Sequence, residues 1–234
     1  MAEQKVAIVT AASRGMGAAC ARELGARGFA LALMARSADV LTLAEQLGAL
    51  GLQGSVAAEA DLRRLVDATL ERHGRVDVVV SNTGHPAKGD LLGLADEEWH
   101  AGLDLLLLNV VRMARLLTPT MLAQGSGVFV NISSFSAIEP GLRFPVSATL
   151  RAALGNFAKL YSQRYAADGL RMNNVLPGWI DTYPVDPESV RAIPQGRAGS
   201  AEEVAKVVAF LASEAASYIT GASLLVDGGL VRGV

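Results

Sequence analysis

The chain contains one cysteine, Cys20, among its 234 residues. A single cysteine excludes an intrachain disulfide and a cluster of thiolate metal ligands. Its neighbours from Gly17 to Ala21 are all small, which favours a buried cysteine on a helix that packs against a sheet. We predict no metal site in this sequence.

Runs of like charge are also absent. The 21 basic and 23 acidic residues are interspersed and leave a formal net charge of −2, so no surface for nucleic acid or anionic lipid is indicated. The most apolar stretch, residues 103–111, is interrupted by Asp104 and Asn109 and is too short to span a bilayer. A strand is predicted from residue 6, which leaves no room for a signal peptide. We expect a soluble, cytoplasmic protein with neither a nucleic-acid nor a membrane partner.

Short apolar segments alternate with amphipathic ones along the whole chain. The apolar segments predict strands that are buried on both faces, as in a parallel sheet: 6–10, 30–35, 54–57, 76–81, 128–133, 172–176 and 223–226. The amphipathic segments predict helices over 17–27, 40–48, 61–73, 96–124, 147–168 and 201–212. With 51% apolar residues and no linker-like segment, the pattern predicts one domain over residues 1–234. Its fold class is α/β, a Rossmann-type, doubly wound parallel sheet with helices on both faces.

A glycine-containing turn follows the first predicted strand, where residues 10–17 read TAASRGMG. Such a turn lets the backbone approach a pyrophosphate, and the next helix offers it free N–H groups and a positive dipole. Ala11 stands where a first glycine is usual, and it fits there only with a negative φ or with tolerated strain. The turn predicts a dinucleotide site, although a tight turn without ligand is the alternative. The predicted contacts are Thr10, Ser13, Arg14, Gly15, Met16 and Gly17.

An arginine, Arg36, follows the second predicted strand. A site selective for NAD usually has an acid there, which accepts a hydrogen bond from the ribose 2′-hydroxyl. Arg36 and Arg14 suit a 2′-phosphate instead, because guanidinium binds phosphate as a planar fork. We therefore predict NADP(H) in preference to NAD(H). The alternative is that one or both arginines are solvated surface residues.

Several segments resemble, in order, the signatures of the short-chain dehydrogenase/reductase family. Residues 10–17 resemble TGxxxGxG, and residues 81–84 (SNTG) resemble NNAG. Residues 131–134 (NISS) match the strand that ends in the catalytic serine, and 173–182 (NNVLPGWIDT) resemble NxVxPGxIxT. Residues 218–221 (YITG) and 226–229 (VDGG) resemble C-terminal signatures. The resemblance covers the chain from end to end and implies hydride transfer to or from a small-molecule substrate.

The resemblance also implies roles for individual residues. Ser134 would hydrogen-bond the substrate oxygen, and Asn109 would hold a water in a proton relay. Asn82 would support the loop beneath the cofactor, with Gly84 in the same segment. The family's adenine-contacting aspartate falls near Ser55, which has no carboxylate. The segment that closes over the nicotinamide would contribute Pro177, Gly178, Ile180 and Thr182.

The family's Tyr-x-x-x-Lys pair is missing. Ser147 stands at the tyrosine position, 13 residues after Ser134, and Arg151 stands at the lysine position four residues later. A tyrosine hydroxyl titrates near about 10 and a neighbouring ammonium lowers that pKa, whereas a serine hydroxyl is a far weaker acid. Arg151 can bind ribose hydroxyls or add positive potential, but it stays protonated and does not relay protons. The family's usual proton transfer is therefore predicted to be absent.

Two other side chains are candidate proton donors. His85 follows the SNTG segment and has a suitable intrinsic pKa, although a solvated loop histidine is the commoner finding. Tyr183 follows Thr182 and is the second candidate. Residues 183–194 form a short segment with three prolines, which predicts a stiff lid over an open cleft or a cleft that a partner chain completes.

The helix predicted over 96–124 is apolar nearly all round between residues 103 and 111. A helix that is wet on one face would not have this composition. With Phe157, Leu160 and Tyr161 it fits a homodimer or homotetramer interface; the alternative is a deeper monomer core.

Three functions fit these residues. The favoured one is an NADP(H)-dependent oxidoreductase that acts on a small carbonyl, alcohol or imine with a non-standard proton donor. The second is a catalytically idle, nucleotide-binding relative that acts as a sensor or structural partner. The third is elimination or isomerisation in the same pocket, which a catalytic His85 independent of nicotinamide redox chemistry would support.

Overall fold

The computed structural model describes residues 4–233. These residues form one seven-stranded sheet in the order β3-β2-β1-β4-β5-β6-β7, and every neighbouring pair is parallel. The strands are β1 (Val6–Thr10), β2 (Ala30–Ala35), β3 (Leu50–Gln53), β4 (Val78–Ser81), β5 (Gly127–Ile132), β6 (Leu170–Pro177) and β7 (Ser223–Val226). The predicted doubly wound parallel sheet is confirmed.

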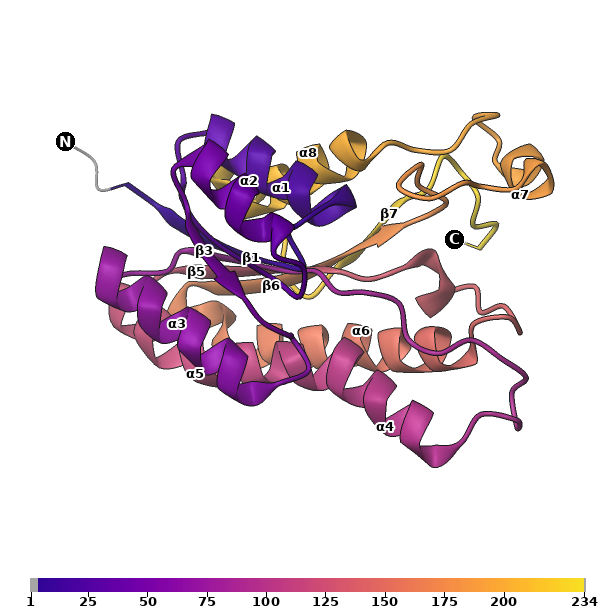
Figure 1. Ribbon diagram of the computed structural model, residues 1–234, viewed down its shortest axis with the longest axis horizontal. Coiled ribbons are helices and arrows are strands. Elements are labelled where there is room, and N and C mark those ends of the chain that lie inside the picture. Colours follow the sequence, from indigo (N-terminus) through magenta and orange to yellow (C-terminus); the bar gives the residue numbers. More distant parts are fainter. Residues whose placement is uncertain (1–3, 234) are drawn as a thin grey trace.

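Two layers of helices cover the sheet (Figure 1). One layer holds α1 (Gly15–Ala26), α2 (Asp39–Leu47) and α8 (Ala201–Ala212). The other holds α3 (Glu59–His73), α5 (Asn109–Gln124) and α6 (Pro145–Tyr165). Two further helices, α4 (Asp96–Leu103) and α7 (Pro187–Ala192), lie toward one end of the molecule. A π-helical turn, Asp104–Leu108, joins α4 to α5.

The apolar residues divide into one core on each side of the sheet. Val78 and Val80 of β4 belong to the core under α1 and α8, and Val79 belongs to the core under α3, α5 and α6. Because successive side chains of a strand point to opposite faces, a strand covered on both sides is apolar at every position. This explains the uninterrupted apolar segments in the sequence.

The third strand lies earlier than predicted. Residues 54–57 were expected as a strand, but the strand is Leu50–Gln53 and residues 54–57 turn into α3. Within the turn, the Ser55 hydroxyl accepts a hydrogen bond from the Ala57 N–H at 3.3 Å, and the Ala58 N–H donates to the Ser55 carbonyl at 3.1 Å. Serine favours such local hydrogen bonds over a strand ladder. The short helix α7 was not expected; it lies in the segment interpreted as a stiff lid.

Tyr161 is a core residue and does not contribute to an exposed face, contrary to the expectation that it belongs to an interface. It is 5% exposed, its hydroxyl hydrogen-bonds the Thr118 hydroxyl at 2.8 Å, and its ring meets Phe129 edge-on. Burial raises the pKa of Tyr161 to about 12. Leu160 is exposed, whereas Phe157 is partly buried.

The continuous helical run from Asp96 to Gln124 is long and apolar enough to cross a membrane by these two criteria alone. In the structure, 44% of its most apolar window is buried against the rest of the protein. A core helix of a soluble protein has the same properties.

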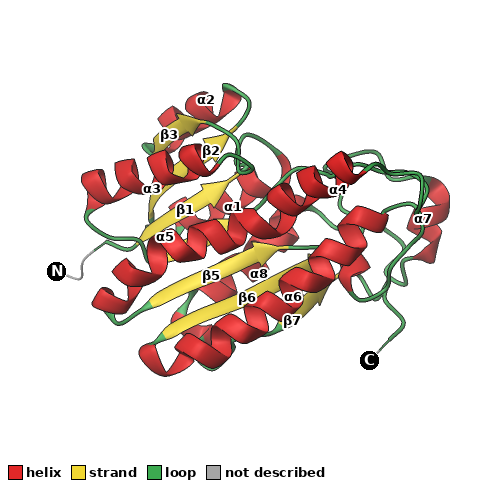
Figure 2. Cartoon of the chain, turned by 90° about the horizontal axis from the view of Figure 1, so that it is seen from below, coloured by secondary structure: helices red, strands yellow, loops and turns green. Residues whose placement is uncertain are grey.

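The sheet order places a switch point between β1 and β4. From β1 the chain extends outward through β2 and β3, and it then returns to add β4 on the other side. Ligands of doubly wound sheets bind at the carboxyl ends of the strands beside such a point. Figure 2 shows the strands pointing toward this end, where loops gather with α4 and α7.

Candidate functional site

The carboxyl end of β1 is tied to the carboxyl end of β4 at the switch point. The Thr10 hydroxyl donates to the Asn82 carbonyl at 2.7 Å and accepts from the Asn82 N–H at 3.0 Å. The Asn82 side-chain amide donates to the Ala11 carbonyl at 3.2 Å. These three bonds join Thr10 and Ala11, the first two residues of the glycine turn, to the segment that was predicted to support it.

Glycine is required within this turn. A Cβ on Gly17 would lie 2.4 Å from the Ala11 carbonyl oxygen and 2.7 Å from the Asn82 amide nitrogen. Gly15 has φ +55°, a conformation that side chains disfavour. Ala11 adopts φ +46° and is the one non-glycine residue among 4–233 with a positive φ. Ala11 therefore does not adopt a negative φ. The chain tolerates the strain of the positive φ instead, which costs about 1–2 kcal/mol.

The N-terminus of α1 is open to a ligand. Arg14 occupies the N-cap position, makes no side-chain capping bond and is exposed, and no acid lies in the first turn. The first N–H groups of a helix need partners from outside the helix, and an anion is a suitable one. This end of α1 therefore offers unpaired N–H groups of the kind that bind an anion, and Ser13, Gly15 and Met16 lie in the adjoining turn.

Arg36 extends from the end of β2 toward Gly84. Its Nη2 atom lies 3.6 Å from the place where a Cβ on Gly84 would stand, so glycine leaves room beside the guanidinium. Neither Arg14 nor Arg36 forms an ion pair with another residue in the part of the chain that the structure describes. Both guanidiniums are available to an anionic ligand on this side of the switch point.

Ser55 lies in the turn after β3. It has no carboxylate of its own, but the carboxylate of Asp61 lies next to it. The Ser55 N–H donates to Asp61 at 2.8 Å, and Asp61 also pairs with Arg64 at 3.1 Å. The sequence did not indicate that Asp61 lies at this position, because the start of α3 brings its side chain back to the end of β3.

The segment after β6 packs over the glycine turn. Pro177 ends β6, and a Cβ on Gly178 would lie 2.8 Å from the Cα of Asp227, so this glycine allows a close backbone approach. Ile180 is buried and pairs with Gly199 in a short parallel bridge. The methyl carbon of Thr182 lies 3.2 Å from the Cβ position of Gly15. The glycine turn near the N-terminus and the 177–182 segment, which were both predicted to bind the cofactor, therefore lie next to each other.

The predicted catalytic side chains Ser134 and Asn109 already have intramolecular partners. Ser134 follows β5, and its hydroxyl accepts from the N–H of Ser136 at 3.2 Å and from the Ser136 hydroxyl at 3.1 Å. Asn109 is buried at the start of α5, where its side-chain amide donates to the Leu105 carbonyl in the π-helical turn. Its Oδ1 atom keeps its acceptor capacity.

Arg151 is a buried cation without a carboxylate partner. It is 7% exposed; its Nε donates to the Ser147 hydroxyl at 3.2 Å and its Nη1 to the Ile132 carbonyl at 2.9 Å. Burial lowers the pKa of Arg151 to about 10, so the group stays protonated at neutral pH. No acidic side chain within residues 4–233 pairs with it. The guanidinium brings Ser147 to the end of β5, near Ser134.

His85 lies near the same guanidinium. Its ring meets Tyr183 edge-on, with 5.4 Å between ring centroids, so the two candidate proton donors are neighbours. Partial burial lowers the pKa of His85, and the charges of Lys88 and Arg151 lower it further. At neutral pH the imidazole is therefore mostly neutral. A hollow of about 290 Å³ is lined by His85, Pro86, Ala87, Glu97, Glu98, Ala101, Gly102 and Leu105.

An aromatic group beside this site was missed in the sequence. Phe135 and Phe144 both contact Trp179, with centroid separations of 5.7 Å and 6.3 Å. Lys88 Nζ lies 5.3 Å and the Arg143 guanidinium carbon 5.6 Å from the centroid of the Phe144 ring. A usable signal was present, since Phe135 directly follows Ser134 and Trp179 directly follows Gly178.

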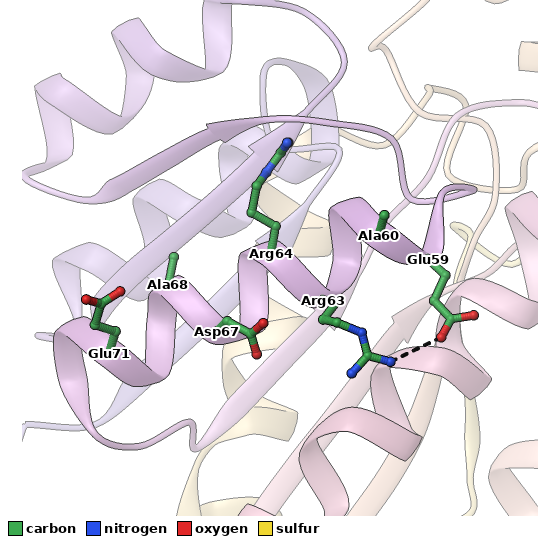
Figure 3. A pocket seen from close by; sticks show the side chains of 7 residues that line it. All are labelled: Glu59, Ala60, Arg63, Arg64, Asp67, Ala68 and Glu71. Atoms are coloured by element: carbon green, nitrogen blue, oxygen red, sulfur yellow. Dashed lines mark hydrogen bonds and ion pairs between the residues drawn. The ribbon is translucent and has the colours of Figure 1, made fainter.

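A second hollow, of about 610 Å³, is lined by one helix, α3 (Figure 3). Its side chains carry charges of both signs, and Arg63 pairs with Glu59 at 3.3 Å. A face of this kind is a solvated helix surface, and none of the predicted site residues lies on it. The lining residues are Glu59, Ala60, Arg63, Arg64, Asp67, Ala68 and Glu71.

Comparison with known proteins identifies relatives over nearly the whole chain. The family model described as enoyl-(acyl carrier protein) reductase matches residues 10–231. The 3-oxoacyl-(acyl-carrier-protein) reductase FabG of Escherichia coli K12 is 33% identical, over 97% of this chain and 98% of the relative. The cis-4-hydroxycyclohexanecarboxylate dehydrogenase of Sinomonas cyclohexanicum is 36% identical, over 97% of this chain and 96% of the relative.

Solved structures agree with these relatives. YwfH, an NADPH-dependent reductase involved in bacilysin biosynthesis, superposes with a TM-score of 0.93 at 26% identity, over 99% of this chain and 100% of that one. The L-sorbose reductase of Gluconobacter frateurii, solved with NADPH and L-sorbose, has a TM-score of 0.89 at 29% identity, over 99% and 98% of the two chains.

Proposed function

Because the chain belongs to the short-chain dehydrogenase/reductase family of oxidoreductases, we propose that it is NADP(H)-dependent and acts on a small carbonyl, alcohol or imine without the Tyr-Lys pair. The observation that carries the proposal is the uncapped N-terminus of α1 beside Gly17, flanked by Arg14 and Arg36. A nicotinamide cofactor held there supplies or accepts the hydride. The NADPH dependence of YwfH and the NADPH bound in the L-sorbose reductase support the preference for the phosphorylated cofactor.

The residues around Ser134 would polarise the substrate. Ser134 hydrogen-bonds the reacting oxygen, and Arg151 places a fixed positive charge where negative charge develops on that oxygen. Ser147 adds a hydrogen bond but no acid catalysis, since its hydroxyl is a weak acid whose oxygen accepts from Arg151. Asn109 Oδ1 holds a water close to the start of α5.

His85 is the proposed proton donor in place of the tyrosine. It comes within charge-interaction distance of Arg151, and its ring rests against Tyr183 in the segment after Thr182. Because the pKa of His85 is lowered from 6.5, only a minority of the molecules carry the charged imidazolium at neutral pH. This fraction, which can donate the proton, grows as the pH falls below 6.5. Reduction is therefore expected to be faster in mildly acidic than in alkaline solution.

Transfer of a labelled hydride tests this function directly. Protein is mixed with NADPH that carries deuterium at the nicotinamide C4 position and with a mixture of ketones, aldehydes and cyclic imines. Deuterium at the former carbonyl or imine carbon of a product, detected by mass spectrometry, supports the proposal. Tight NADPH binding without deuterium in any product, under conditions where a related reductase transfers it, contradicts the proposal.

One observation favours the second candidate, a nucleotide-binding protein without catalysis. The Ser147 hydroxyl and the Asn109 amide are both engaged inside the protein, and Arg151 cannot relay protons. On that reading the dinucleotide is a sensed ligand, and the protein binds NADPH but shows no label transfer.

We also propose a cytoplasmic homodimer or homotetramer. In the π-helical turn, Leu105, Leu107 and Leu108 are only partly buried, and Leu160 on α6 is 63% exposed. Apolar side chains grouped on neighbouring helices are more stable when a second copy covers them. Sedimentation velocity measures the assembly.

A further inference from the structure

Three cations lie near the predicted reaction site at the carboxyl end of the sheet. Arg151 is buried there, while Lys88 and Arg143 are exposed on the loops that follow β4 and β5. None of the three forms an ion pair in the described part of the chain. Lys88 and Arg151 both lie near enough to His85 for their charges to lower its pKa. Their positive potentials therefore overlap at one place.

The acids in the neighbouring loops have other partners. Asp90 accepts from the Leu92 N–H at 3.3 Å, and Glu139 accepts from the Arg232 N–H at 3.0 Å. Glu98 of α4 accepts from the Ala95 N–H at 2.9 Å. Each carboxylate is held by a backbone group of its own surroundings and makes no bond to the cations. A backbone hydrogen bond leaves a carboxylate charged, but it orients the group, and the N–H groups of Lys88 and Arg143 have no carboxylate partner among the described residues. These N–H groups are therefore available to an anionic ligand.

An apolar surface lies next to these cations. Phe144, Trp179 and Phe135 form a continuous row of rings, and Lys88 and Arg143 both lie over the Phe144 ring at one end of it. A cation over an aromatic face keeps its N–H groups free for an anion, because the ring accepts charge without a directed hydrogen bond. Trp179 and Phe135 follow Gly178 and Ser134, so the row starts beside the site of reaction.

We propose that the substrate is a carboxylate with an apolar ring or chain. Its carboxylate binds between Lys88 and Arg143, its hydrocarbon part lies along Phe144 and Trp179, and its reacting oxygen meets Ser134 and Arg151. This inference rests on the proposed oxidoreductase function and specifies the substrate class of the same site. The loop cations are specificity residues that bind the remote end of the substrate.

Binding of paired probes tests the inference without turnover. The full-length protein, saturated with NADP⁺, is titrated by calorimetry with cyclohexanecarboxylate and with the isosteric neutral cyclohexanecarboxamide. A charge-assisted pair of hydrogen bonds is expected to make the carboxylate bind about tenfold more tightly than the amide. Equal binding of the two probes, or no binding of the carboxylate to protein that holds NADP⁺, overturns the inference. Failure to bind NADP⁺ or NADPH is a separate result, which overturns the proposed function.

Replacement of the two loop cations by neutral residues tests whether they form the carboxylate subsite. In the double variant Lys88→Gln/Arg143→Gln, the preference for the carboxylate is expected to fall to about twofold or less while NADPH binding is kept. The matched control Lys206→Gln/Arg22→Gln removes the same two charge types from exposed positions on α8 and α1 and should keep the full preference. A preference that survives the loop exchange rules out Lys88 and Arg143 as the carboxylate site. The wild-type comparison of acid and amide stands whether or not the variants fold.

Discussion

The nucleotide half and the reaction half of this site are held together by different means. At the nucleotide half, backbone shape determines the arrangement: Gly17 admits the Ala11 carbonyl and the Asn82 amide where no side chain would fit. At the reaction half, side chains determine it: Arg151 spans from Ser147 to the Ile132 carbonyl and leaves His85 and the loop cations around it.

This difference explains why one half keeps the family pattern while the other departs from it. A backbone turn at the end of β1 is part of the fold, so changing it disturbs packing as well as binding. The side chains at positions 147 and 151 lie on one face of α6, and exchanging them leaves the path of the helix unchanged. The chemistry can therefore change while the fold and the cofactor site remain.

The largest effect on stability and NADPH binding is expected from Gly17→Val, because the new side chain would disrupt the backbone arrangement of the nucleotide half. The new side chain would meet the Ala11 carbonyl oxygen at 2.4 Å, so β1 and α1 would have to separate. We expect a loss of about 3 kcal/mol of stability and no measurable NADPH binding. Thermal unfolding and calorimetry check both. Gly155→Ala in α6, whose added Cβ would have only an ordinary contact at 3.9 Å, should keep NADPH binding and raise stability by about 0.5–1 kcal/mol, because alanine favours a helix interior over glycine.

The next effect in size restores the family pair in the reaction half. In Ser147→Tyr/Arg151→Lys, a tyrosine with a lowered pKa becomes available as a general acid, which is worth about 10²-fold or more in rate. Ketone reduction by NADPH is expected to rise by that factor. Ser147→Phe/Arg151→Lys, which adds the ring without the hydroxyl, is the control. An inert Tyr/Lys variant that binds NADPH normally would show that the rest of this half is not arranged for reduction.

His85→Gln separates the proposed donor from the rest of the reaction half. The pKa of His85 is lowered, so the wild-type reduction rate should increase as the pH falls below 6.5 and the imidazole takes up its proton. In the variant this increase should be absent, with a rate lower by about 10²-fold at acidic pH. Rates measured between acidic and alkaline pH check it, and His100→Gln in α4 is the matched histidine control. An unchanged pH profile would remove His85 from the mechanism.

A smaller effect is expected from the two arginines of the nucleotide half. Arg14→Gln and Arg36→Gln should each weaken NADPH binding about tenfold and leave NADH binding nearly unchanged, because only NADPH carries the 2′-phosphate. Fluorescence titration with both nucleotides measures this. Arg22→Gln, on the exposed face of α1, serves as control. An equal loss of affinity for NADH and NADPH would mean that these arginines do not bind the 2′-phosphate.

The smallest effect concerns the strained residue of the turn. Ala11→Gly should relieve about 1–2 kcal/mol of strain at φ +46° and lose about 0.5–1 kcal/mol of it to the entropy of glycine, for a net stabilisation of about 1 kcal/mol. The expected rise in the unfolding midpoint is about 2–4 °C. Ala12→Gly, at a buried position without positive φ, should destabilise instead. A lower midpoint for Ala11→Gly would show that Ala11 is not strained.

The sequence predicted most of the fold because buried parallel strands are apolar throughout. The strands over 6–10, 30–35 and 223–226 have the predicted bounds. The strand predicted over 54–57 was wrong because a serine turn after a short edge strand has a similar composition. The helix α7 was not predicted, since six residues are too few for a periodic pattern.

The site was predictable only where a motif carries it. Ordered segments brought together the residues of the glycine turn and of the 177–182 segment. The missing carboxylate partner of Arg151, the contact between His85 and Tyr183 and the cations over Phe144 depend on side chains from separate loops. Such contacts follow from packing in three dimensions and leave no local pattern. Tyr161 was misplaced for a related reason, because periodicity does not show which apolar face of α6 meets the sheet.

Calorimetric titration of the purified protein with NADPH and, in parallel, with NADH tests the central claim most directly. If the nucleotide half is intact although the reaction half departs from the family pattern, the protein should bind NADPH with micromolar affinity and at least about tenfold more tightly than NADH. Absence of binding by either nucleotide would contradict the account and leave a family fold without its cofactor site.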